Sequence, residues 1–148
     1  MEIQRDFKEL LESLNARRVE YLIVGGYALA HLGAPRATGD LDIYLHCTLE
    51  NARRVIEALI AFGFNPAGLG PEDFSTPGTI VRMGVPPVRV DLITDIDGVN
   101  WEEAEKGKTA GNYGGVPVHY IGKREFIANK KASGRHKDLG DIEALGEL

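Results

Sequence analysis

The sequence predicts an α/β fold of the α+β kind, in which helices flank a mixed β-sheet and the carboxy-terminal part is helical. Three observations support this prediction. Apolar residues recur at helical spacing in several segments, short apolar or alternating segments lie between them, and no repeat or linker interrupts the chain. Helices and strands that alternate in this way pack as layers around one core, so we expect a single domain spanning residues 1–148.

The amino-terminal half is expected to alternate helices with strands. Residues 3–16 and residues 49–62 place apolar side chains on one face at helical spacing, which predicts two amphipathic helices. Residues 21–24 form a short apolar run that predicts a buried strand, and residues 27–32 predict a short helix. Residues 40–45 largely alternate between polar and apolar side chains, which predicts a strand with one buried face.

The carboxy-terminal half carries shorter segments. Residues 63–78 are rich in glycine and proline and predict a long surface loop, and loops of this length are often functional. The remaining elements are expected at residues 79–83 and 88–93 (a pair of strands), 95–98 (a turn), 101–106 (a helical turn), 116–120 (a strand), and 123–131 and 137–148 (two helices).

Composition restricts the class of protein. The 148 residues are 43% hydrophobic and 26% charged, as is usual for soluble globular proteins. No apolar run is long enough to span a bilayer, the first residues do not resemble a secretory signal, and the single cysteine, Cys47, excludes an internal disulfide. By elimination, we expect a cytoplasmic protein that does not associate with membranes.

The charge distribution is uneven. The net charge of −5 argues against a protein that coats nucleic acid by charge alone. Between Lys123 and Lys137, however, six residues are Lys or Arg and one, Glu125, is acidic. This segment is either a phosphate-binding surface or a solvated helical face.

Two carboxylates lie two positions apart in the predicted strand at residues 40–45. Asp40 and Asp42 therefore project from the same side of that strand. Adjacent carboxylates repel each other unless a cation neutralises them, and their hard oxygen atoms suit magnesium or manganese better than zinc. The alternative is an exposed strand face that carries two solvated acids.

A third carboxylate favours the metal-binding interpretation. Asp91 lies in the predicted strand at residues 88–93, on the face that it shares with Arg89 and Ile93. Asp has a low propensity for strands, so its presence there requires a reason. If this strand lies beside the first, Asp91 completes a cluster of three carboxylates with Asp40 and Asp42.

A glycine pair precedes the acidic strand. Gly25 and Gly26 lie between a predicted strand and a predicted helix, where glycine lets the backbone approach a phosphate closely. An ordinary tight turn is the alternative.

Two further candidates lie in the predicted loop before the acids. Arg36 could bind a triphosphate or anchor the loop by a salt bridge, and Thr38 could hold the loop by local hydrogen bonds.

Together these residues resemble the DNA polymerase β-type nucleotidyltransferase superfamily. Within it, they are similar to small prokaryotic nucleotidyltransferase-like proteins related to the toxin components of abortive-infection toxin–antitoxin systems. The similarity rests on Gly25-Gly-Tyr-Ala-Leu29, Gly33, Arg36, Thr38, Asp40-Leu-Asp-Ile43, Asp91 and the terminal pattern Lys130-x4-Arg135-x-Lys137-Asp138-x2-Asp141. It covers residues 20–145, and it implies a nucleotidyltransferase-like fold.

The resemblance also implies roles for these residues. Asp40 and Asp42 would hold two divalent cations, Mg²⁺ or Mn²⁺, and Asp91 would bind one of them and help to deprotonate an acceptor hydroxyl. Gly25 and Gly26 would face the terminal phosphates of a nucleoside triphosphate. One departure is Tyr27, which stands where many members of the superfamily have Ser.

Basic residues near the carboxy terminus complete the expected nucleotide site. Lys130 and Arg135 would face the nucleotide or an anionic acceptor. Alternatively, Arg135 and Asp138 form an ion pair three residues apart on one helix, a contact worth only a few tenths of a kcal/mol, roughly.

The expected function is metal-dependent transfer of a nucleotide from a nucleoside triphosphate to a hydroxyl acceptor. By resemblance, the acceptor is RNA or protein, and an antitoxin-like protein is a candidate partner. Two alternatives remain open, a non-catalytic binding protein that keeps the fold and a metal-dependent phosphohydrolase that uses the same acids.

Overall fold

The computed structural model describes residues 3–34, 39–85 and 87–146. Two residues predicted to contact the nucleotide, Arg36 and Thr38, lie outside the described residues.

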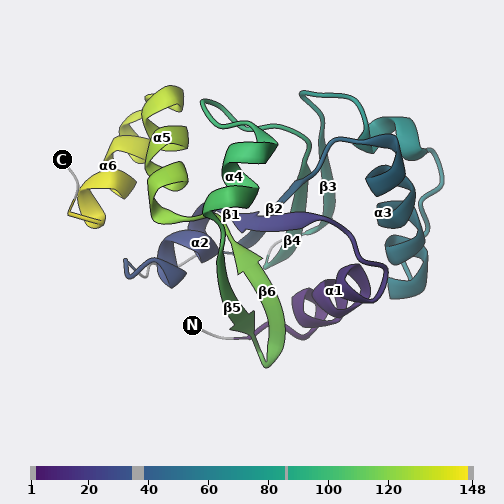
Figure 1. Ribbon diagram of the computed structural model, residues 1–148. Coiled ribbons are helices and arrows are strands. Elements are labelled where there is room, and N and C mark those ends of the chain that lie inside the picture. Colours follow the sequence, from purple (N-terminus) through teal and green to yellow (C-terminus); the bar gives the residue numbers. More distant parts are fainter. Residues whose placement is uncertain (1–2, 35–38, 86, 147–148) are drawn as a thin grey trace.

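Helices and strands alternate along most of the described chain (Figure 1). The helices are α1 (Arg5–Ala16), α2 (Gly25–His31), α3 (Leu49–Phe62), α4 (Trp101–Gly107), α5 (Lys123–Ser133) and α6 (His136–Ala144), together with the 3-10 helix η1 (Pro71–Phe74). The strands are β1 (Tyr21–Val24), β2 (Asp40–Leu45), β3 (Ile80–Val85), β4 (Val88–Ile93), β5 (Thr109–Tyr113) and β6 (Val116–Tyr120).

Six strands in the described part of the chain form one mixed sheet with the order β3-β4-β2-β1-β6-β5. β2 runs parallel to β4 and β1 runs parallel to β6, whereas the other neighbouring strands are antiparallel. Figure 1 shows α1 and α3 at one end of the sheet and α5 and α6 at the other. The predicted architecture, a mixed sheet flanked by helices with a helical carboxy terminus, is therefore confirmed.

The hydrophobic core fills the space between the sheet and the helices at the α1 end. Both α1 and α3 turn an apolar face inward, and β2 turns its alternate apolar residues to the same side. The buried side chains of α1 and β2 are Phe7, Leu10, Leu11, Leu14, Leu41, Ile43, Tyr44 and Leu45. Because side chains alternate along a strand, burial of Leu41 and Ile43 directs Asp40 and Asp42 to the opposite face.

Local signals in the sequence explain where α3 begins and ends. The Thr48 side chain accepts a hydrogen bond from the Asn51 amide at 3.1 Å, which satisfies an amide that the first turn leaves unpaired. Gly63 follows the last turn in the left-handed conformation, with φ of 105°, which glycine adopts without strain.

Two elements differ from the sequence-based prediction. β5 was not predicted, because its sequence is polar and contains glycine, but Gly114 and Gly115 form a hairpin turn with positive φ at both residues. The glycine pair was therefore a usable hairpin signal. The second difference is η1, which interrupts the loop predicted over residues 63–78 and buries Phe74 completely against α3.

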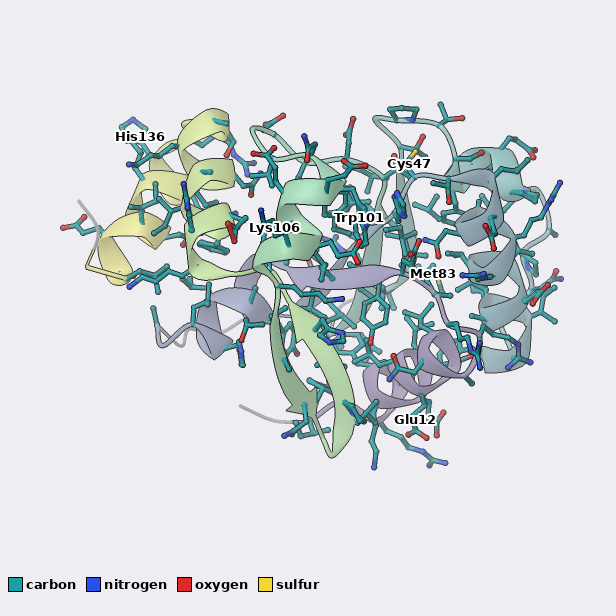
Figure 2. The ribbon with its side chains drawn as sticks, viewed as in Figure 1. Glu12, Cys47, Met83, Trp101, Lys106 and His136 are labelled. Atoms are coloured by element: carbon teal, nitrogen blue, oxygen red, sulfur yellow. The ribbon has the colours of Figure 1, made fainter. Side chains whose placement is uncertain are left out.

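Aromatic side chains link α4 to the sheet. Trp101, labelled in Figure 2, is buried at the start of α4, and its ring stacks on His46 with 4.8 Å between the ring centroids. It also meets the ring of Tyr44 edge to face at 5.2 Å.

The longest described helix, α3, has 14 residues, and no described helix is long and apolar enough to cross a membrane.

Candidate functional site

The parallel pairing of β2 with β4 brings the three predicted acids to one face of the sheet. In this register Asp42 lies opposite Asp91, and Asp40 lies opposite Arg89. Paired residues on neighbouring strands point to the same side, so Asp40, Asp42 and Asp91 project together, away from the core beneath β2. Asp91 is buried, whereas Asp40 and Asp42 are half-buried.

The surroundings of Asp42 disfavour its charged form. Burial of its carboxyl, followed by the charges of Asp91 and Asp40, raises the pKa of Asp42 to about 6. Lys130 and Lys137 lower this pKa in part, so their positive charges reach the site from the carboxy-terminal segment. A carboxylate in this environment is stabilised by any cation that approaches it.

Two arginine side chains already lie among the acids. The Nη2 atom of Arg89 donates a hydrogen bond to Asp40 Oδ2, and the Nε atom of Arg89 lies 3.8 Å from Asp91 Oδ1. Arg82, on the edge strand β3, places its Nε 3.5 Å from the same oxygen. Sequence reasoning placed Arg89 on the face of Asp91 but gave it no role. The alternation Val88-Arg-Val-Asp was the signal that could have identified it.

Polar atoms remain unpaired at this contact. Within the described chain, Arg89 Nε and Asp91 Oδ1 are buried and have no hydrogen-bond partner. The described residues also contain no group of three His, Cys, Asp or Glu side chains already arranged to hold a metal ion. The three acids thus share a face without forming such a group.

The backbone of Gly25 lies directly against the carboxylate of Asp42. It has φ of +69°, and a Cβ atom there would overlap the carboxylate of Asp42. Gly26 is buried next to it, and both residues belong to the first turn of α2. The helix predicted at residues 27–32 begins two residues earlier in the structure, and the positive φ of Gly25 marks the turn from β1 into α2. The close approach of Asp42 to this backbone explains why position 25 must be glycine.

A cleft of about 350 Å³ opens beside Asp42 and Gly25. Its walls come from β1, β2, the start of β3, the turn after β4, and α5 with the residues that follow it. The charged and polar residues that line it are Asp42, Asp95, Asp97, Asn129, Lys130, Ser133 and Arg135. The predicted site residues Gly25, Asp42, Lys130 and Arg135 therefore meet in one cleft, whereas Asp40 and Asp91 lie beside it.

Lys130 and Arg135 are both held by a buried acid that the sequence-based site did not include. Asp138 on α6 is fully buried and accepts a hydrogen bond from Arg135 Nε at 2.7 Å and one from Lys130 Nζ at 3.3 Å. Lys130 Nζ also lies 3.8 Å from Asp141. Burial raises the pKa of Asp138, but the hydrogen bonds from Arg135 and Ser133 and the charge of Lys130 outweigh it, so the pKa lies well below its usual range.

The two basic residues differ in exposure. The Lys130 side chain is 12% exposed, whereas the Arg135 side chain is 69% exposed. The helical pair of Arg135 with Asp138, considered above as an alternative, is therefore present, and Arg135 also lines the cleft. Figure 2 shows the neighbouring residue His136 at the outer start of α6.

The chemistry of these groups suits a divalent cation. The acids supply hard oxygen atoms, Asp91 Oδ1 is buried without a hydrogen bond in the described structure, and the Asp42 carboxyl is destabilised in its charged form. Asp40, Asp42 and Asp91 are the residues that could hold such an ion.

Residues 3–148 match the family described as "Nucleotidyl transferase of unknown function (DUF2204)". The chain belongs to this nucleotidyltransferase family. Its match covers nearly the whole sequence, including the acids and the carboxy-terminal helices. No protein with a curated function gave a significant match.

Solved structures show the same fold. A Thermotoga maritima protein assigned as a nucleotidyltransferase is 14% identical, with a TM-score of 0.60 over 97% of this chain and 89% of that one. The lincosamide antibiotic adenylyltransferase LnuA, solved with lincomycin bound, is 14% identical, with a TM-score of 0.56 over 99% of this chain and 98% of that one. An antigenic nucleotidyltransferase-like protein from Paracoccidioides brasiliensis is 18% identical, with a TM-score of 0.56 over 95% of this chain and 72% of that one.

Proposed function

We propose that this protein is a metal-dependent nucleotidyltransferase that transfers a nucleotide from a nucleoside triphosphate to a hydroxyl acceptor, with two Mg²⁺ or Mn²⁺ ions. The observation that carries this proposal is the register of β2 and β4, which sets Asp42 opposite Asp91 on one face. That arrangement brings carboxylates together beside a cleft, and burial together with the charges of Asp91 and Asp40 raises the pKa of Asp42. Family membership supports nucleotidyl transfer in general terms.

In the proposed reaction, the acceptor oxygen bonds to the α-phosphorus of the triphosphate, and the bond from that phosphorus to the bridging oxygen of the departing pyrophosphate breaks. Asp40 and Asp42 would hold two divalent cations, which would supply charge stabilisation for the attacking and departing oxygens. Asp91 would contribute to one cation site and accept the proton of the acceptor hydroxyl.

The remaining cleft residues bind the triphosphate. Gly25, which lines the cleft, and Gly26, which follows it in the first turn of α2, are proposed to face the terminal phosphates through their backbone. Lys130 contributes positive charge from the cleft wall, and the exposed Arg135 reaches the phosphates or an anionic acceptor. Arg36 and Thr38, which precede β2 in the sequence, are proposed to complete the nucleotide contacts.

The acceptor is proposed to be RNA or protein, in line with the resemblance to toxin components, and an antitoxin-like protein is the proposed partner. A small hydroxyl compound is a second acceptor class. The lincosamide antibiotic adenylyltransferase LnuA, which shares the fold over 98% of its chain, was solved with lincomycin bound. The cleft of about 350 Å³ in the present protein suits a small ligand.

The proposed transfer is tested with nucleoside triphosphates labelled separately at the α and γ phosphorus. Purified protein is incubated with each triphosphate, Mg²⁺, and either cell extract or a panel of small hydroxyl compounds. We expect the α label to move to an acceptor and the γ label to leave as pyrophosphate, and Asp42→Asn to abolish both. The matched control is Asp6→Asn, which removes an exposed acid in the first turn of α1.

Each alternative function gives a different result in this assay. Release of γ-labelled inorganic phosphate without transfer of the α label would indicate a phosphohydrolase. Binding of nucleotide without any turnover, or no binding, would indicate a protein that keeps the fold for a non-catalytic role.

A further inference from the structure

Arg89 occupies the position between two of the three acids. Its guanidinium donates a hydrogen bond from Nη2 to Asp40 Oδ2, and its Nε lies 3.8 Å from Asp91 Oδ1. Arg89 is the register partner of Asp40 and precedes Asp91 by two residues on β4, so all three side chains share one face. The positive charge of Arg89 therefore lies between carboxylates from two different strands, Asp40 of β2 and Asp91 of β4.

Arg89 forms a hydrogen bond with Asp40 but none with Asp91. The hydrogen bond to Asp40 is formed, whereas Arg89 Nε and Asp91 Oδ1 are buried and lack hydrogen-bond partners among the described residues. A buried donor that faces a buried acceptor beyond hydrogen-bond distance leaves both groups without the hydrogen bond that would offset their burial. The contact between Arg89 and Asp91 is consequently weaker than an ordinary buried ion pair, and another arrangement of the same groups can satisfy them better.

Arg89 also has room to move. Its side chain is 30% exposed, and its register partner on the edge strand β3 is Gly84, which places no side chain next to it. The edge-strand residue that approaches Asp91 is Arg82, with 3.5 Å between its Nε and Asp91 Oδ1 and with a side chain that is 63% exposed. The guanidinium of Arg89 can therefore leave the acids toward solvent without displacing the core.

We propose that Arg89 is a resident counter-ion of the acidic site, which holds Asp40 and Asp91 in the metal-free protein and moves away when a divalent cation binds. Arg89 is thus a positioning residue that competes with the cation for the same carboxylate oxygens. This inference rests on the proposed function only in taking Asp40 and Asp91 as cation ligands. The position of Arg89 between Asp40 and Asp91 explains why the acids share a face but are not already arranged as a group of metal ligands in the described structure.

The test measures binding of Mn²⁺ alone, without nucleotide, by isothermal titration calorimetry. Arg89→Gln keeps a polar side chain of similar shape but removes the charge. Because a like charge a few ångströms away opposes a cation strongly, we expect Arg89→Gln to bind Mn²⁺ at least about tenfold more tightly than the wild type. We also expect its melting temperature without metal to fall, since only the more exposed Arg82 then remains close to Asp91 to offset the repulsion among the acids.

Two further arginines serve as comparisons. Arg54→Gln removes the same charge from α3, where Arg54 pairs with Glu50, and is expected to leave Mn²⁺ affinity unchanged. Arg82→Gln removes a more exposed guanidinium from Asp91 and is expected to have a smaller effect than Arg89→Gln.

Other outcomes overturn the inference and separate it from the proposed function. If the wild type binds Mn²⁺ and Arg89→Gln binds it equally or more weakly, Arg89 supports the ligands instead of competing with the cation. If neither protein binds Mn²⁺, the metal-dependent function fails as well.

A second measurement needs no variant. In the wild-type protein, the side-chain Nε–H signal of Arg89, assigned through bonds by NMR, is followed during titration with Mg²⁺. We expect the signal to shift and to saturate together with the backbone amide of Asp91. An unchanged Arg89 signal while the Asp91 amide responds would show that the guanidinium stays in place.

Discussion

At the residue scale, Gly25 and Asp42 depend on each other. The Asp42 carboxylate packs against the backbone of Gly25, whose φ of +69° is itself unfavourable for any residue with a Cβ atom. Position 25 is therefore constrained twice, once by its backbone conformation and once by a neighbouring side chain. These two constraints can be measured separately.

Gly25→Ala is expected to lower the free energy of unfolding by at least about 3 kcal/mol, because backbone strain and overlap with Asp42 add. Gly134→Ala is the matched control. It has φ of +65°, but its added Cβ would meet only Lys131 O at an ordinary 3.7 Å. That variant should lose about 1–2 kcal/mol from strain alone. Urea denaturation of both variants measures the difference, and equal losses would show that the close approach to Asp42 has no energetic weight.

Asp42→Asn should stabilise the metal-free protein at neutral pH. In the folded protein the pKa of Asp42 is raised to about 6 from 3.8, so the folded state binds the proton more tightly than the unfolded state. The unfavourable contribution of this carboxylate is therefore absent below the lower pKa, grows as pH rises through the window between them, and is complete above about 6.

In EDTA at pH 7.5, we expect the asparagine variant to gain about 1–2 kcal/mol, less than the full shift implies because Asp42 is partly exposed. The gain should vanish near pH 4, and Mn²⁺ binding at this site should be lost. Thermal melts at both pH values and a Mn²⁺ titration check these outcomes. Asp95→Asn, in the same cleft, is the control for loss of one negative charge. A gain that is independent of pH would contradict the explanation by charge.

At the element scale, one buried carboxylate joins α5 to α6. Asp138 on α6 is fully buried and binds both Lys130 of α5 and Arg135, which precedes α6. Lys130 is itself largely buried, with its ammonium 5.4 Å from the ring centroid of Phe126. The position of the cleft wall therefore depends on Asp138 more than on either basic residue.

Asp138→Asn should cost about 3 kcal/mol of stability, because the largely buried Lys130 then keeps only the more distant carboxylate of Asp141, at 3.8 Å. Arg135→Ala removes the exposed partner of the same carboxylate and should cost at most about 1 kcal/mol. Chemical denaturation of the two variants gives the comparison. Similar losses of stability in both variants would indicate that Arg135, despite its exposure, contributes as much as Asp138 to the contact between α5 and α6.

Arg135→Ala should also weaken nucleotide binding. An exposed guanidinium beside the cleft can pair with phosphate, and an interaction of that kind weakens with salt. We expect lower affinity and a shallower salt dependence than in the wild type, measured at two salt concentrations. Unchanged affinity together with an unchanged salt slope would limit Arg135 to its pair with Asp138.

At the scale of the whole molecule, the site concentrates negative charge in a protein whose net charge is already −5. A divalent cation at the acids should therefore stabilise the entire fold, since β2 and β4 lie inside the sheet. At a Mn²⁺ concentration 100 times the dissociation constant, the gain is about 2.7 kcal/mol, which corresponds to a rise in melting temperature of roughly 8 °C for a chain of this size. EDTA should reverse the rise, and Asp42→Asn should abolish it. A rise that persists in Asp42→Asn would place the cation elsewhere.

Much of the fold could be predicted from the sequence, because local patterns are strong where one face is buried. The alternation in β2 and the helical spacing of apolar residues in α1 and α3 reflect contact with a single core. Prediction was wrong where local preference is weak. β5 is polar and becomes a strand only by pairing with β6, and η1 forms in a loop because Phe74 finds a place against α3.

The candidate site divides in the same way. The sequence by itself determined which acids share a strand face, since Asp40 and Asp42 are two residues apart and Asp91 alternates with apolar neighbours. Only the tertiary structure decided that β4 lies beside β2 with Asp91 opposite Asp42, that Gly25 touches the Asp42 carboxylate, and that Asp138 holds Lys130 and Arg135. The physical reason is range: side-chain direction follows from local backbone geometry, whereas strand order, register and ion pairs between helices depend on residues far apart in the chain.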